Sequence, residues 1–169
     1  MIEIAPDKFD ESIFRLLGKD WALITSGDIE NFNMMTASWG GAGVLWAKPV
    51  ATIYVRPERY THEYIERTRR FTLSFFPSQL RQALAEMGSK SGRNFDKMHY
   101  EALTPIEMPS QQVAFAQARI VMDCQVLYKD TMSEEKFLDK QPLEKWYGGE
   151  HGNLHDIYIA EIKHIWINE

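Results

Sequence analysis

The stretch Ile157-Tyr-Ile-Ala-Glu-Ile-Lys-His-Ile-Trp-Ile167 alternates with a period of two. In an extended strand, one face would carry Tyr158, Ala160, Ile162, His164 and Trp166. The opposite face would carry Ile157, Ile159, Ile165 and Ile167, together with Glu161 and Lys163. This pattern is typical of a half-buried β-strand, because successive side chains of a strand point to opposite faces of its sheet.

A second long alternating run precedes it, with an apolar face made of Ile120, Met122, Cys124, Val126 and Tyr128. Shorter strands are predicted at 21–25, 34–39, 50–55 and 71–76, and glycines at 40, 41 and 43 interrupt the second of these. Short helices are predicted at 9–17, 60–69, 78–87 (with Ser78 as cap and Gly88 as stop) and 94–100. We therefore predict a mainly β fold. It is an antiparallel Greek-key-like barrel with a few short helices, in a single domain over residues 1–169.

Charge and cysteine content narrow the function. The formal net charge is -5, which gives no electrostatic support for nucleic-acid binding. Cys124 is the only cysteine, so a disulfide within the chain is impossible, and we expect a small buried residue there rather than a redox thiol. No secretion signal or membrane-length apolar run is found in the sequence. We expect a cytoplasmic protein that does not associate with membranes.

The segment Asn33-Met-Met-Thr-Ala-Ser-Trp-Gly40 is followed by Lys48-Pro49 and by Arg56-Pro-Glu-Arg-Tyr-Thr61. Further along come Phe71-Thr-Leu-Ser-Phe-Phe76, Gly88-Ser-Lys-Ser-Gly-Arg93 with Asp96-Lys97, and His155-Asp-Ile-Tyr-Ile-Ala-Glu-Ile162. This ordered set resembles the flavin reductase-like family, and within it the flavoredoxin branch. The resemblance implies an FMN-binding split barrel, usually a homodimer with two sites at the subunit interface.

FMN has an anionic phosphate, a flat apolar ring, and a ring edge that gains negative charge on reduction. Thr36 and Ser38 place two hydroxyls on one face of a strand, and the small Ala37 lets backbone approach the ring. Taken alone, Thr-Ala-Ser is equally compatible with an ordinary polar strand. The candidate cofactor-binding residues are Asn33, Met35, Thr36, Ala37, Ser38, Trp39, Arg56, Tyr60, Thr61, Ser89, Ser91, Gly92 and Lys97.

The phosphate is expected at two basic, hydroxyl-bearing segments. Thr61 could cap the helix that follows the 56–61 turn, and residues 89–93 combine two hydroxyls, two cations and a glycine. Lys97 is placed on the helix after that loop, within reach of the phosphate or the ring edge. Solvated surface loops are the alternative for both segments, and Arg59 in particular could be an ordinary exposed arginine.

Aromatic residues offer walls for the ring, and the candidates are Trp39, Trp46, Trp146 and Tyr147, the last two in a loop that continues through Gly149. His151 and His155 lie four residues apart, but no further ligands complete a recognisable metal motif, so no metal is predicted. His155 matches the histidine that precedes the last strand in the family.

Two residues depart from the family pattern. Ala160 stands where a glycine usually precedes the glutamate of the last strand, which could alter backbone approach near the flavin. Met34 stands where this branch often has threonine, but it should lie on the opposite face of the strand from Met35.

The leading hypothesis is an oxidoreductase that passes electrons through bound FMN. No Gly-x-Gly-x-x-Gly dinucleotide fingerprint follows a strand, so NAD(P)H would bind transiently, or a protein would donate the electrons. The alternative is a non-catalytic FMN-binding electron carrier or flavin storage protein. A third possibility is a ligand-free barrel used for dimerisation or protein binding. A homodimer is expected from the resemblance.

Overall fold

The computed structural model describes residues 1–148 and 152–168. Its main sheet has the strand order β3-β2-β6-β9-β10-β5-β4, and β1 (Ile2–Ile4) pairs with β10. All pairings in it are antiparallel. The strands are β2 (Ala22–Asp28), β3 (Asn31–Ala37), β4 (Gly40–Leu45), β5 (Lys48–Val55), β6 (Arg70–Phe75), β9 (Ile120–Thr131) and β10 (Asp156–Ile167). The mainly β, antiparallel split-barrel prediction is confirmed.

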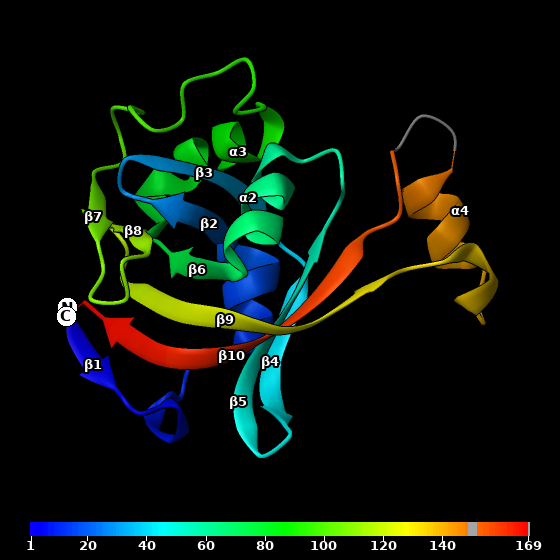
Figure 1. The fold of residues 1–169 in the computed structure, drawn as a ribbon, viewed down its shortest axis with the longest axis horizontal. Helices are drawn as coiled ribbons and strands as arrows, with labels where there is room; N and C mark the ends of the chain where they lie inside the picture. Colours follow the sequence, from blue (N-terminus) through cyan, green and yellow to red (C-terminus); the bar gives the residue numbers. More distant parts are fainter. Residues whose placement is uncertain (149–151, 169) are drawn as a thin grey trace.

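The curled sheet encloses a core to which six of its strands contribute (Figure 1). This core is built from aliphatic and aromatic side chains such as Ile24, Ile53, Phe71, Met122 and Tyr158, all almost fully buried. The buried Cys124 belongs to it, as expected, and burial raises the pKa of its thiol. Ala160 also lies in this interior, so its side chain fills the barrel.

A second core covers the outer face of β2, β3 and β9. Here α3 (Arg81–Ser89) and the segment with β7 (Pro105–Glu107) and β8 (Val113–Phe115) pack on Leu23, Met34 and Val121. Met34 therefore points away from Met35, which faces the barrel interior, as the alternation predicts. Both faces of the central strands are buried, which explains why Val121 and Asp123 are as buried as their neighbours.

Two β-bulges change the expected face assignments. The register between β9 and β10 shifts between Ile159 and Ala160 and again between Ile162 and His164. Because a one-residue shift exchanges the two faces of a strand, Ile165 joins Ile162 in the barrel core. His164 and Trp166 move to the other side, where Trp166 packs on the second core. The prediction that these two share the face of Tyr158 was wrong.

Several helix and turn predictions also need correction. The first helix is α1 (Ile13–Arg15), capped by Ser12 and continued as a π-helical turn over Leu16–Asp20 rather than starting at residue 9. The glycines at 40, 41 and 43 do not interrupt a strand; they belong to β4, which forms a hairpin with β5. A 3-10 turn over Ser78–Leu80 precedes α3, Ser78 makes no cap bond, and Gly88 lies inside the helix. Residues 94–100 form turns, not a helix.

α2 (Tyr60–Thr68) matches its prediction and packs beside β2 and β3. The connection from β9 to β10 contains a 3-10 turn (Glu134–Lys136) and α4 (Gln141–Tyr147), and Figure 1 shows α4 projecting from the barrel. A further 3-10 turn covers Pro6–Lys8. No helix in the described part of the chain has the length and hydrophobicity needed to cross a bilayer.

Candidate functional site

A cleft of about 150 Å³ opens where β3 and β5 end and where α2 and β10 begin. Its lining residues are Met35, Thr36, Ala37, Ser38, Trp39, Tyr54, Arg56, Arg59 and His155. We call this space the flavin cleft. It brings together six of the predicted cofactor-binding residues, the five from Met35 to Trp39 and Arg56. β5 supplies Tyr54, and the Arg-Pro turn after β5 supplies both arginines.

Two guanidinium groups in the cleft have buried nitrogens without partners among the described residues. The Arg59 Nη2 has no hydrogen-bond partner. The Arg56 Nη1 also has none, although it forms a long ion pair with the Glu58 carboxylate at 4.0 Å. The Arg56 Nη2 donates to the Trp146 carbonyl at 3.0 Å. Burial lowers the pKa of Arg59, Glu58 opposes this effect, and Arg56 adds to it. Buried donors normally find an acceptor, so these nitrogens indicate an anionic or carbonyl-rich ligand.

An aromatic wall closes the other side of the cleft. The Trp39 ring lies 5.0 Å from that of Trp146 and 5.5 Å from that of His155, between ring centroids. The Tyr147 hydroxyl and the His155 Nδ1 are 2.6 Å apart, and the Arg56 guanidinium lies over the Tyr147 ring at 5.1 Å. Burial lowers the pKa of His155 to about 4. The positive charges of Arg56 and Arg59 add to this effect, and the negative charge of Glu58 opposes it. His155 is therefore neutral near pH 7. Gly149 and His151 lie outside the described residues.

A packed polar unit adjoins the cleft. With its amide turned to satisfy both atoms, the Asn33 oxygen accepts from the Thr61 hydroxyl at 2.7 Å and from the Thr61 N–H at 3.1 Å. Gly92 lies directly on Asn33, because a Cβ there would clash with the Asn33 side-chain amide and would lie 3.1 Å from the Tyr60 ring. Four predicted residues from three distant segments thus form one contact unit. Thr61 is buried inside α2, so its predicted capping role is wrong; Arg59 is the N-cap.

Lys97 is buried beneath this unit. It reaches the second core side of β3 from a turn rather than from the predicted helix, and its Nζ donates to the carbonyls of Met34 and Met87, each at 2.8 Å. Burial, together with the nearby charge of Arg59, lowers the pKa of Lys97 to about 7. Ser89 is the last residue of α3 and Ser91 lies in the loop that follows; both are exposed. The Ser89 hydroxyl donates to the Glu86 carbonyl, and the Ser91 hydroxyl accepts from the Arg93 N–H.

Comparison with known proteins identifies the family of this chain. Residues 14–169 match the model of the flavin reductase-like domain. The chain belongs to the flavin reductase-like family. The flavoredoxin branch suggested by the motifs fits the structural neighbours described next.

Three solved structures illustrate the neighbourhood. An FMN-binding protein from Thermus thermophilus with bound p-hydroxybenzaldehyde is 19% identical, with a TM-score of 0.70 over 100% of this chain and 83% of that one. Flavoredoxin of Desulfovibrio vulgaris is 20% identical, with a TM-score of 0.68 over 95% and 78%. A Streptomyces globisporus NADH:FAD oxidoreductase with NAD and FAD fragments is 14% identical, with a TM-score of 0.63 over 88% and 74%. At these identities the likeness shows the fold alone. No curated protein sequence matches the chain.

For a flavin reductase-like chain, the residues present fit a flavin mononucleotide. The unpaired nitrogens of Arg56 and Arg59 suit an anion or ring carbonyls, and Ala37 leaves room for a flat ring beside Trp39. Thr36 uses its hydroxyl proton to bind the Leu84 carbonyl of α3, so it anchors β3 and offers a ligand only its lone pairs.

Sequence reasoning overlooked Tyr54 and did not assign Arg59 and His155 to the cofactor site. Tyr54 gave no signal, because a tyrosine in a strand is usually a packing residue. Trp46, another candidate ring wall, is not brought to the cleft within one copy of the chain. It lies at the turn of the β4–β5 hairpin beside Tyr128, with 6.4 Å between ring centroids, and does not line the cleft.

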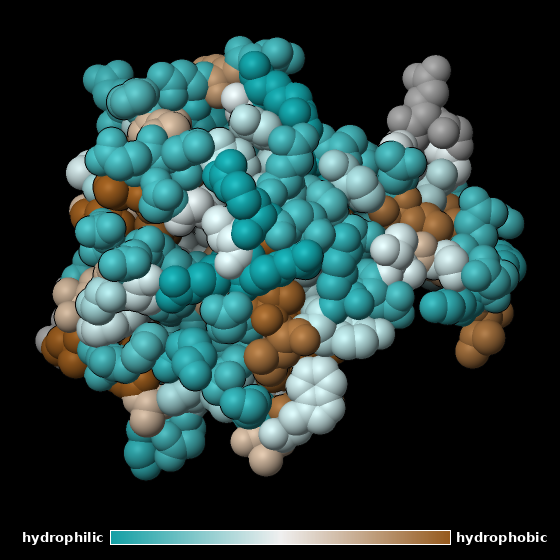
Figure 2. All heavy atoms as spheres, viewed as in Figure 1, coloured by the Kyte–Doolittle hydropathy of each residue, from teal (hydrophilic) through white to brown (hydrophobic). Residues whose placement is uncertain are grey.

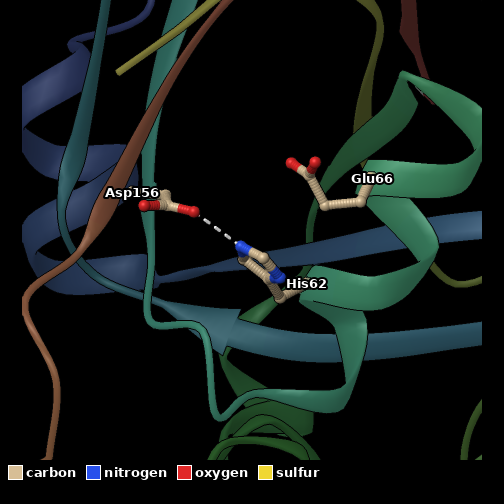
Figure 3. A group of neighbouring side chains, drawn as sticks. All are labelled: His62, Glu66 and Asp156. Atoms are coloured by element: carbon tan, nitrogen blue, oxygen red, sulfur yellow. Dashed lines mark hydrogen bonds and ion pairs between the residues drawn. The ribbon is translucent and has the colours of Figure 1, made fainter. Parts of the chain in front are cut away.

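A second charged cluster lies beside α2, and Figure 3 shows three of its members, His62, Glu66 and Asp156. The Lys129 ammonium lies 3.0 Å from the Glu66 Oε1 and 2.9 Å from the Asp156 Oδ2, so it occupies the position between the carboxylates. His62, Thr131 and Tyr158 supply the remaining hydrogen bonds, at 2.6 to 2.7 Å. Because these acceptors already share a cation, the cluster is a structural ion network rather than a metal centre.

Proposed function

We propose that this chain binds FMN in the flavin cleft and acts as an oxidoreductase of the flavin reductase and flavoredoxin type. The observation that carries the proposal is the pair of buried guanidinium nitrogens, Arg56 Nη1 and Arg59 Nη2, without hydrogen-bond partners in the described structure. Both arginines line the flavin cleft together with residues 35–39, which belong to a segment that resembles the family. Solved neighbours named as FMN-binding protein and flavoredoxin support the choice of cofactor.

The chain's own residues have distinct tasks in this proposal. Arg59 and the Asn33–Thr61–Gly92 unit hold the phosphate end, with Lys97 beneath them. Ala37 and Ser38 present backbone to the ring, while Trp39 and His155 restrict water at its edge. A bound flavin supplies hydride or single-electron chemistry itself, so the protein's part is to position it and to set its potential. Arg56, as a fixed positive charge, favours the reduced state.

Titration with flavins tests the proposal. Adding the purified protein to FMN and to FAD, and following flavin fluorescence, measures both dissociation constants. We expect FMN to bind in the micromolar range or tighter and FAD more weakly, because the adenosine half finds no walled space in the cleft. Lack of FMN binding would remove the proposal. Equal affinity for the two flavins would leave an oxidoreductase of broader cofactor use.

The electron donor needs its own experiment. Anaerobic addition of NADH or NADPH to the FMN-loaded protein should bleach the flavin band near 450 nm if the chain accepts hydride from a pyridine nucleotide. Bleaching by dithionite, but by neither nucleotide, would indicate a carrier reduced by a protein donor. Turnover of free flavin, read as continued NADH consumption with added FMN, separates a reductase from a single-turnover carrier.

We also propose that the chain works as a homodimer in the cytoplasm. Apolar side chains are exposed around the β4–β5 hairpin, with Val44 80%, Trp46 56% and Tyr128 45% exposed. Figure 2 shows hydrophobic surface gathered where β9 and β10 cross this hairpin. Contiguous exposed apolar surface of this kind supports an interface between copies. Light scattering during size-exclusion chromatography measures the mass directly, and a monomer of 19.7 kDa would contradict the dimer.

A further inference from the structure

A cluster of three side chains lies on the surface at the start of α2. Tyr60 is the first residue of the helix, and Glu63 lies one turn further along, on the same face. Arg93 reaches them from the loop after α3: its guanidinium lies over the Tyr60 ring, 4.5 Å from the ring centroid, and its Nη2 pairs with the Glu63 carboxylate. We call these three residues the Arg93 cluster. Within it, the Arg93 guanidinium covers one face of the Tyr60 ring.

The Arg93 cluster adjoins the phosphate end of the proposed flavin site. A Cβ at Gly92 would clash with the Asn33 side-chain amide and would lie 3.1 Å from the Tyr60 ring, so the backbone just before Arg93 touches both. In the proposed function, the Asn33–Thr61–Gly92 unit holds the phosphate of FMN. FAD differs from FMN by an adenylate joined to that phosphate. An adenylate joined to a phosphate held there would meet the Arg93 cluster next.

An adenine ring and the Arg93 guanidinium both have favourable contacts to make with the Tyr60 ring. Bases bind to proteins by stacking on aromatic side chains, and a guanidinium stacks on the same kind of ring face. Arg93 in its observed position therefore competes with an adenine for the face that it covers. The Arg93 and Glu63 side chains are exposed, and an exposed ion pair contributes little stability. The competition is moderate, which suits discrimination between two related ligands.

We propose that Arg93, held over Tyr60 by Glu63, makes the site selective for FMN over FAD, because it occupies the ring face on which the adenine of FAD would stack. The proposal rests on the proposed flavin function and adds a specificity-determining residue to it. Arg93 also brings a positive charge to the phosphate end. That charge attracts both cofactors, since each carries about two negative charges on its phosphate groups. The ratio of the two dissociation constants therefore isolates the effect on the adenine.

A matched pair of variants tests the residue. Isothermal titration calorimetry with FMN and with FAD gives the ratio of their dissociation constants in wild type, in Arg93→Ala and in Lys90→Ala. Lys90 has similar surroundings: its ammonium lies 4.2 Å from the Phe95 ring centroid and 2.9 Å from the Glu86 carboxylate. We expect Arg93→Ala to reduce the FAD-to-FMN ratio at least about fivefold. Lys90→Ala removes the same charge without uncovering Tyr60, so its ratio should equal that of wild type.

A double variant tests the stacking surface. Tyr60→Leu keeps an apolar side chain at the start of α2 but removes the aromatic face. When it is combined with Arg93→Ala, FAD should lose the gain in affinity seen in Arg93→Ala alone. A gain that persists would show that the adenine binds elsewhere, which overturns the proposal. If the double variant does not fold, Arg93→Ala, at an exposed position, still decides the question by itself.

Three results with Arg93→Ala would refute the proposal. One is an unchanged ratio. Another is an equal change in Lys90→Ala, which would be an effect of net charge. The third is a ratio that rises, which would make Arg93 a ligand of the second phosphate of FAD.

A failure of the proposed function is distinguishable from a failure of this inference. If the wild type binds neither flavin, the proposed function fails by itself. Titration of the flavin-free wild type and Arg93→Ala with adenosine 5′-monophosphate then decides the role of Arg93 separately. The inference stands if the variant binds this nucleotide at least about fivefold more tightly than wild type, and it fails if the two affinities are equal.

Discussion

Two groups of buried charge lie close together near α2, and they differ in how completely their charges are paired. At the start of the helix, Arg56 and Arg59 keep buried nitrogens without partners in the described structure. Further along the helix, Glu66 and Asp156 share Lys129 and accept hydrogen bonds from Thr131 and Tyr158. Where every charge is paired, contacts within the protein offset the free-energy cost of removing the charges from water. Where a buried donor has no partner, a bound ligand can supply the missing contact. This difference supports the proposal that the first group belongs to a binding site, whereas the second group stabilises the fold.

The largest expected effect comes from breaking the paired group. In Asp156→Asn the Lys129 ammonium and the His62 ring lose their carboxylate, and we expect the free energy of unfolding to fall by about 2 to 3 kcal/mol. Burial alone would raise the pKa of Asp156, but hydrogen bonds from Thr131, His62 and Lys129 hold it below its ordinary value. The stability from this carboxylate is thus present at neutral pH and is lost as the pH falls through that lowered pKa.

Urea denaturation measures this loss, and Asp130→Asn provides the control. Asp130 lies on the neighbouring strand, is partly exposed, and forms a long ion pair with Lys136 at 3.8 Å. Its Oδ1 accepts from the Thr131 N–H at 2.8 Å, which an asparagine oxygen can also do, so the variant should lose less than about 0.5 kcal/mol. FMN affinity should change little in either variant. Equal stability of the two variants would show that the network is no more than a surface ion pair.

The unpaired group should respond in the opposite way. Arg59→Met removes a buried donor that has no protein partner, so the flavin-free protein should be as stable as wild type or more stable. The dissociation constant for FMN should rise about 10- to 100-fold, the value of one or two charge-assisted hydrogen bonds. Fluorescence titration measures it. Arg67→Met, on the exposed side of the same helix, should leave it unchanged; a similar loss in both variants would point to net charge instead of a specific contact.

A smaller effect is expected where the cleft is built by close packing. In Gly92→Ala the added methyl group would meet the Asn33 amide, which two hydrogen bonds to Thr61 hold in place. We expect a stability loss of about 1 to 2 kcal/mol and weaker FMN binding, because the shift moves the start of α2. Ser91→Ala, at the neighbouring position on the exposed loop, is the control. It removes a hydroxyl but leaves the backbone unchanged, so it separates the effect of a lost hydroxyl from the effect of disturbed packing. Unchanged FMN binding in Gly92→Ala would show that the Asn33–Thr61–Gly92 unit is not part of the cofactor site.

The sequence predicts those features of the fold that depend on local pattern, and it misses those that depend on pairing between distant segments. Period-two patterns at 120–129 and 157–167 predict the barrel, because side-chain alternation is a local property of a strand. The bulges that move His164 and Trp166 to the other face depend on the pairing partner, so alternation within one strand does not disclose them. The strand β4, with three glycines among its residues, resembles a loop by composition and becomes a strand only through pairing with β5.

The candidate site also divides into residues that the sequence predicts and residues that only the folded structure identifies. Residues 35–39 and Arg56 were found because they lie in two segments that resemble the family, and the structure places them in one cleft. Arg59 and His155 carried recognisable chemistry, but only burial distinguishes an unpaired arginine from a solvated one. The network of Lys129, Glu66 and Asp156 brings together residues from three elements far apart in the chain, and no spacing in the sequence predicts it.

Lys97 is intermediate between the fully paired group around Asp156 and the group of Arg56 and Arg59. Its titration gives the smallest predicted effect. Its ammonium is buried and has two carbonyl partners but forms no ion pair with a carboxylate in the described structure, and its pKa is lowered to about 7. Between pH 7 and 10.5 the unfolded chain therefore binds more protons than the folded one, and stability from this site rises with pH. This contribution to stability is fully present above about pH 10.5 and is lost as the pH falls towards 7.

Urea denaturation at pH 7, 8 and 9 of wild type and Lys97→Met isolates this contribution, because other titrating groups cancel in the difference. We expect a slope well below the roughly 1.4 kcal/mol per pH unit of one fully coupled proton. If Lys97 lies near the FMN phosphate, bound FMN raises its pKa by favouring the ammonium, so the slope should shrink in the loaded protein. A slope that is the same with and without FMN would place Lys97 with the architecture, alongside Lys129.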